Sequence, residues 1–170
     1  LILSARAKIE KEPNYSNVAS ALAVNALYKE VFRESVDSDT FDLQYKKSFV
    51  QGIKKLVKNE ILNPELLGYD LKKLSEAIEP QRDKKFKYLG LQILIDRYFI
   101  RTNNKIIESP QSFWMRIAMG LALNEENKEE RAIEFYNLFS NLLYTPSTPT
   151  LFNSGTTHSQ LSSCYLNTFD

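Results

Sequence analysis

The single cysteine, Cys164, is the residue of this chain best suited to redox chemistry. A thiol can donate a proton, or it can give up electrons by closing a disulfide with a second thiol. With one cysteine and one histidine, the chain can form neither an internal disulfide nor a closed zinc site, so a partner thiol would have to come from elsewhere. A lone cysteine is also often a small buried apolar residue, and the sequence leaves that structural role open.

Residues 144–157, upstream of Cys164, are rich in Pro, Thr, Ser and Gly. Their prolines lack backbone donors and predict a loop rather than a regular helix. A loop stiffened by Pro and Gly could direct amides and hydroxyls at a phosphate or a sugar, although the Gly-Lys-Ser/Thr ending of a P-loop is absent. The same composition is typical of a plain linker. The candidate hydroxyl donors are Ser147, Thr148, Thr150, Ser154 and Thr156.

Three further residues invite a functional interpretation. His158 has no Cys, Asp or Glu at ligand spacing, so we expect a surface residue and no metal site. Trp114 and the aromatic residues near it are more typical of a helical core than of a ligand cage. Arg116 fits either a substrate contact or a helix residue whose charged end reaches solvent.

Most of the chain carries the spacing of amphipathic helices. Apolar residues recur every three to four positions, which predicts an all-helical domain over 1–143. The dipeptide Asn103-Asn104 between apolar stretches indicates a short hairpin. Helix starts are indicated by Ser16, Asn63-Pro64, Ser109-Pro110 and the pair Asn127 and Glu130, spaced as in a capping box. We expect helices at 1–12, 16–32, 41–56, 64–78, 82–98, 110–121 and 127–142, with 82–98 the most buried.

The pattern changes after residue 143. Residues 160–169 alternate around Leu161, Cys164 and Leu166, which predicts a strand. We therefore divide the chain into a helical domain, 1–143, and a second part, 144–170, made of the polar loop and one strand. The chain begins without Met in a helical pattern and ends after this strand-like run, so we expect it to be a piece of a longer protein.

The composition is that of a soluble globular protein. The 170 residues are 43% hydrophobic and 25% charged, and 22 basic residues oppose 21 acidic ones for a net charge of +1. This balance argues against a nucleic-acid or membrane surface, and we read the lysines at 46, 47, 54, 55 and 58 as one solvated helix face. No long apolar run or signal peptide is present, so we expect a cytoplasmic location.

Several segments closely resemble the large subunits of ribonucleotide reductases. The strongest are Ser147-Thr-Pro-Thr-Leu-Phe-Asn-Ser-Gly-Thr156 and Gln160-Leu-Ser-Ser-Cys164. Four others lie in the same order along nearly the whole chain: Ile9-Glu-Lys-Glu-Pro13, Tyr88-Leu-Gly-Leu91 with Asp96-Arg-Tyr-Phe99, Ser109-Pro-Gln, and Phe113-Trp-Met-Arg-Ile-Ala-Met-Gly-Leu-Ala122.

The resemblance implies a fold and a chemistry. The fold is a mainly helical N-terminal region that leads into the first strand of a ten-stranded α/β barrel. The activity is reduction of ribonucleoside diphosphates to deoxyribonucleotides by thiyl-radical chemistry. The position matching Cys164 is one of two thiols that become a disulfide while the 2′-hydroxyl leaves as water. The positions matching Thr148, Ser163 and Cys164 contact the substrate.

The resemblance also implies partners. These are the remainder of the large subunit, a small subunit that generates a radical at a dimetal-tyrosyl centre, thioredoxin or glutaredoxin, and a second large subunit in a homodimer. The chain itself is expected to hold no cofactor, to keep most ATP and dNTP effector sites outside its length, and to be inactive alone. A cobalamin-dependent (class II) reductase remains an alternative, as do a helical interaction module with a structural Cys164 and a nucleotide-binding regulatory fragment.

Overall fold

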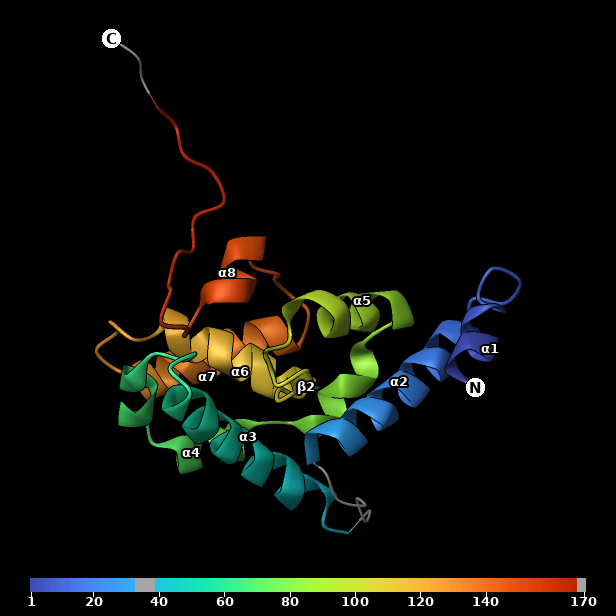
Figure 1. Cartoon of the computed structure of the whole chain (residues 1–170), viewed down its shortest axis with the longest axis horizontal. Helices are drawn as coiled ribbons and strands as arrows, with labels where there is room; N and C mark the ends of the chain where they lie inside the picture. Colours follow the sequence, from blue (N-terminus) through green and yellow to red (C-terminus); the bar gives the residue numbers. More distant parts are fainter. Residues whose placement is uncertain (33–38, 168–170) are drawn as a thin grey trace. The chain divides into compact units, whose positions relative to one another are not determined.

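The computed structural model describes residues 1–32 and 39–167, and it is mainly helical (Figure 1). The chain divides into two compact units. Unit 1 comprises 1–52 and 75–113, and unit 2 comprises 53–74 and 114–170. The division passes through three helices and differs from the expected boundary at 143/144, which stays a prediction about the parent protein. The stretch between the helices expected at 16–32 and 41–56 lies largely outside the described residues.

Unit 1 is built around α2, Tyr15–Phe32, which packs on α1, Ile2–Arg6, and on α5, Tyr88–Ile93. Val18, one of the apolar residues at helical spacing in α2, is half exposed. The buried positions are mainly the small residues near it, Ala19, Ser20 and Ala23, because small side chains let neighbouring backbones approach closely. Ser16 lies inside the first turn, where its hydroxyl accepts a hydrogen bond from the Tyr88 amide at 3.1 Å.

The predicted helix over 82–98 is wrong as a single element. This stretch contains a 3₁₀ helix η2, Pro80–Lys85, then α5, and then a π-helix η3, Leu94–Tyr98. It is also not the most buried helix, since Leu89 is 70% exposed. The most buried helix is α6, Pro110–Leu121, in which every residue from Pro110 to Met119 is buried.

The predicted hairpin is confirmed. Strands β1, Arg101–Thr102, and β2, Lys105–Ile106, pair antiparallel. Asn103 and Asn104 both have positive φ, 51° and 60°, as a two-residue turn that matches strand twist requires.

Helix α3, Phe41–Lys58, also agrees with its prediction. Tyr45, Phe49, Ile53 and Leu56 are buried along one face, and Lys47, Lys54 and Lys58 are exposed. The cap at Asn63 is confirmed as well, because its side chain accepts from the Glu65 amide at the start of η1, Pro64–Gly68. The expected helix then breaks, and α4, Leu71–Ala77, begins anew where the Asp70 carboxylate accepts from the Lys72 and Lys73 amides.

Unit 2 contains most of α6, together with α7, Lys128–Ser140, and α8, Thr148–Asn153. The capping box predicted for α7 is wrong: the Asn127 side chain makes no capping hydrogen bond, and Glu130 forms an ion pair with Lys73. Trp114 and Phe139 are both buried with their rings 6.0 Å apart, which confirms the aromatic core.

The segment after α8 contains no strand among its described residues. Residues 159–167, red in Figure 1, have no regular secondary structure, and residues 168–170 of the predicted strand lie outside the described part. A strand requires a neighbouring strand to satisfy its backbone groups. Because the described chain pairs none with this segment, the prediction of a first barrel strand is not supported here.

Candidate functional site

Thr148 is the first residue of α8, a short helix that the sequence did not predict. We expected Pro149 to exclude a helix, but it lies in the first turn, where a backbone N–H has no intrahelical acceptor to lose. Thr148 is exposed on this turn. The helix therefore holds the Thr148 side chain at a defined place on the surface of unit 2.

Most of the expected hydroxyl donors form hydrogen bonds within unit 2. The Ser154 hydroxyl donates to the Ile117 carbonyl at 2.8 Å, and the Thr156 hydroxyl donates to the Asn153 carbonyl at 2.8 Å. The Ser147 and Thr150 hydroxyls bond each other at 3.1 Å. The backbone amides of residues 151, 154 and 156 also bond within the segment. The interpretation of these hydroxyls as ligand donors stays a prediction, and much of the set also stabilises the fold of the segment.

Arg116 of α6 holds α8 in place through hydrogen bonds to its backbone. Its side chain is fully buried, and its guanidinium donates to the Ser154 carbonyl at 2.7 Å and to the Leu151 carbonyl at 3.4 and 3.5 Å. These carbonyls lie at the carboxyl end of α8, where helix carbonyls lack intrahelical donors. Both earlier interpretations of Arg116, a substrate contact and a charge that reaches solvent, are therefore wrong.

Two glycines allow α6 and the end of α8 to lie in direct backbone contact. A Cβ atom built on Gly120 would lie 2.1 Å from the Gly155 nitrogen and 2.7 Å from its Cα, closer than atoms can pack. Gly155 has a φ of 77°, a conformation that favours glycine. The side chains of Ser154 and Arg116 complete this junction.

The chain that leads to Cys164 turns back onto α8. The Asn153 amide group donates to the Gln160 carbonyl at 2.7 Å, and the Thr150 hydroxyl donates to the Leu161 carbonyl at 3.3 Å. Residues 162–167, which include Ser163 and Cys164, are exposed. His158 is exposed as predicted.

Unit 1 contains a buried carboxylate that the sequence did not reveal. Asp83 is 2% exposed and accepts hydrogen bonds from the Tyr28 hydroxyl at 2.6 Å, the Tyr45 hydroxyl at 2.8 Å and the Gln111 side-chain amide at 2.6 Å. Burial raises the pKa of Asp83 to about 6, and the three donors offset this only in part. Burial, followed by the nearby Asp83 charge, also raises the pKa values of Tyr28 and Tyr45.

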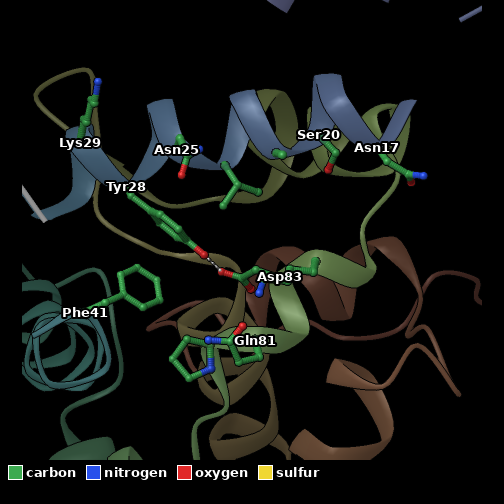
Figure 2. A pocket seen from close by; sticks show the side chains of 12 residues that line it. Asn17, Ser20, Asn25, Tyr28, Lys29, Phe41, Gln81 and Asp83 are labelled. Carbon is green, nitrogen blue, oxygen red and sulfur yellow. Dashed lines mark hydrogen bonds between the residues drawn. The ribbon is translucent and has the colours of Figure 1, made fainter. Parts of the chain in front are cut away.

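A pocket of about 920 Å³ opens beside this cluster. Figure 2 shows the Tyr28 side chain directed at Asp83, with Asn25 and Lys29 on the same helix, α2. The lining residues come from α2, η2 and the start of α3, all within unit 1. Thr148, Ser163 and Cys164 do not line this pocket, so it belongs to a different part of the chain from the predicted site.

Asp83 and Arg116 differ in how clearly the sequence could have indicated that they are buried. In the sequence, Arg116 is flanked by Trp114, Met115, Ile117 and Met119. A helix that is apolar all round is a buried helix, so a charged residue within it is expected to be buried too. Asp83 lies in Gln-Arg-Asp-Lys-Lys, which reads as a solvated run and carries no such signal.

Within the described ranges 1–32 and 39–167, no helix combines the length and apolar character needed to cross a membrane. Across the same ranges, no three His, Cys, Asp or Glu side chains gather as a possible metal site.

Comparison with known proteins points to one family. Residues 84–159 match the model of the ribonucleotide reductase all-alpha domain. The chain is 49% identical over 168 residues to the ribonucleoside-diphosphate reductase subunit alpha of Chlamydia muridarum, with 98% of this chain and 16% of that protein covered. The corresponding subunit of Helicobacter pylori strain 26695 is 40% identical over 168 residues, with 98% of this chain and 20% of that protein covered.

A more distant relative, the ribonucleoside-diphosphate reductase large subunit of Plasmodium falciparum, is 35% identical over 155 residues, with 91% of this chain and 18% of that protein covered. The chain thus spans 16–20% of the length of these relatives.

Proposed function

Because the chain belongs to the ribonucleotide reductase family and matches the N-terminal region of its large subunits, we propose that the full-length protein reduces ribonucleoside diphosphates to deoxyribonucleotides. The observation that carries this proposal is the 49% identity to a subunit alpha across 98% of the chain. The proposed reaction exchanges the 2′-hydroxyl of the ribose for hydrogen.

In this proposal, Cys164 is one of two redox thiols. The ribose loses its 2′-hydroxyl as water, and a proton from one thiol assists that departure. The two thiols supply two electrons and close one disulfide, so each substrate reduced consumes one dithiol. A third cysteine, as a thiyl radical, takes the 3′-hydrogen and returns it at the end.

Thr148 and Ser163 are proposed to contact the substrate. Both are exposed neutral hydroxyls that can hydrogen-bond sugar or phosphate oxygens. The firm attachment of α8 to α6 supports this role, since a preorganised loop loses less conformational freedom when a ligand binds.

The proposed activity requires other chains. We place the radical source in a small subunit with a dimetal-tyrosyl centre, and reduction of the disulfide with thioredoxin or glutaredoxin. The large subunits are proposed to form a homodimer, with most ATP and dNTP effector sites outside this chain. Turnover that depends on added small subunit supports this assignment, whereas turnover with adenosylcobalamin alone would assign the protein to class II. The isolated chain should produce no deoxynucleotide.

The decisive experiment is Cys164→Ser in the full-length large subunit, assayed with its radical source and dithiothreitol. We expect loss of turnover in a folded protein, because serine cannot close a disulfide. Ser159→Ala, an exposed change five residues earlier, is the matched control and should keep normal turnover. Normal turnover of the Cys164→Ser enzyme would reject the redox role.

A helical interaction module with a structural Cys164 predicts the reverse: altered stability and unchanged chemistry.

A further inference from the structure

The position of α8 on α6 is set by side-chain contacts with backbone carbonyls, in both directions. Arg116 of α6 donates to the Leu151 and Ser154 carbonyls, and the Ser154 hydroxyl donates back to the Ile117 carbonyl. All of these groups are buried. Such reciprocal bonds fix both the distance between the two helices and the rotation of α8 about its own axis.

A second pair of contacts continues from α8 to the segment that carries the proposed thiol. The Asn153 side chain holds the Gln160 carbonyl at 2.7 Å, and the Thr150 hydroxyl holds the Leu161 carbonyl at 3.3 Å. Cys164 follows three residues after Leu161. A continuous path therefore runs from the interior of α6, through α8, to the start of the exposed segment.

We propose that Arg116 and Asn153 are positioning residues for the reaction: Arg116 fixes α8 with Thr148, and Asn153 fixes the start of the segment with Ser163 and Cys164. The inference rests on the proposed function and adds two residues that contact neither substrate nor reacting atoms. Arginine suits this place because its planar group offers several donors in fixed directions, so it can hold two carbonyls at once. A lysine carries one mobile ammonium group on a flexible stem and cannot fix that geometry.

The sharpest test is Asn153→Ala in the full-length large subunit, because Asn153 is only partly buried and its loss should leave the fold intact. A shift of about 1 Å at a reacting group can lower a rate by about 100-fold, so we expect kcat to fall about tenfold or more. The melting temperature should change little. The rate at which one equivalent of substrate oxidises the dithiol, without external reductant, should fall in parallel.

Asn141→Ala is the matched control. The Asn141 side-chain amide donates to the Asn137 carbonyl at 2.8 Å, also at the end of a helix, but that bond stays within α7. The Asn141→Ala variant should change the melting temperature as little as Asn153→Ala does, and it should leave kcat unchanged. Equal kcat values for the two variants would overturn the role of Asn153.

Arg116→Lys tests the first step of the path while keeping the positive charge. We expect a raised KM for the substrate, because Thr148 is displaced, together with a lowered kcat. A variant that melts earlier but has wild-type kcat and KM below its melting temperature would overturn the positioning role of Arg116.

The outcome also separates this inference from the proposed function. Retained turnover of the Cys164→Ser enzyme rejects the function itself. Lost turnover of that enzyme, with normal kinetics of the Asn153 and Arg116 variants, rejects the positioning inference alone.

Discussion

Asp83 in unit 1 and Arg116 in unit 2 are both buried, and their charges are satisfied in opposite ways. In unit 1, the carboxylate of Asp83 accepts from side chains of α2, α3 and α6: Tyr28, Tyr45 and Gln111. In unit 2, the guanidinium of Arg116 donates to two backbone carbonyls within a single short helix. A buried charge is costly without such partners, so both arrangements are required by the burial itself.

The two arrangements have different consequences. The Asp83 cluster joins three elements far apart in sequence, and its charge can be removed by a proton at moderate pH. The Arg116 cluster holds one piece of backbone, and its charge is permanent, because arginine does not lose its proton in proteins. We infer that unit 1 has a stability that varies with pH, whereas the junction of α6 and α8 stays fixed across the same range.

The largest effect is expected from Arg116→Met. Methionine fills a similar volume but leaves the Leu151 and Ser154 carbonyls buried without these donors. The free energy of unfolding should fall by about 4 kcal/mol, because each of the two buried carbonyls left without a donor costs about 1–3 kcal/mol. Urea denaturation measures this. Arg131→Met, on an exposed arginine paired with Glu134, should have little effect, and equal losses for the two variants would contradict the role given to burial.

The second largest effect is expected in the pH dependence of the free energy of unfolding, to which Asp83 contributes. Its pKa is raised from 3.8 to about 6, so its contribution to stability is fully present below about pH 4 and is lost as the pH rises through 6. By linkage this amounts to about 3 kcal/mol between those limits. Asp83→Asn keeps an oxygen for the tyrosines and carries no charge, so it should remove this dependence. Urea denaturation at several pH values from 4 to 7 should show a flatter curve, and an unchanged slope would reject the assignment.

The smallest effect is expected from the paired changes Gly120→Ala and Gly90→Ala. A Cβ at Gly120 meets the backbone of Gly155, so overpacking should cost about 2 kcal/mol. A Cβ at Gly90, within α5, has nothing within 4 Å, and alanine there should add about 0.5–1 kcal/mol of stability. Thermal unfolding of both variants measures the difference. Shifts of the same sign would contradict the close approach of α6 and Gly155.

The sequence predicted best those elements whose signals are local. The spacing in α3, the cap at Asn63, the turn at Asn103-Asn104 and the start of α6 at Pro110 were all read correctly. Each depends on side chains that act within a few residues of their own position.

The features that the sequence did not indicate depend on contacts between distant residues. Nothing in the pattern of 82–98 indicated a division into three short helices, or that residues 160–167 would lack a strand partner. For the candidate site, Thr148, Ser163 and Cys164 came from a resemblance and remain predictions. The anchoring bonds of Arg116 and Asn153 join residues 38 and 7 positions apart, so only the structure could reveal them.

The carbonyls at the end of α6 accept hydrogen bonds from two distant side chains: Ile117 from Ser154, and Met119 from Tyr69. A ribosome releases the chain from its amino end, so α6 leaves the ribosome before Ser154 does. Until then Arg116 has no α8 to bond, and its charge has to remain in water. The last turns of α6 can therefore be buried only after residues 151–154 have left the ribosome, so this burial comes late in the folding of unit 2.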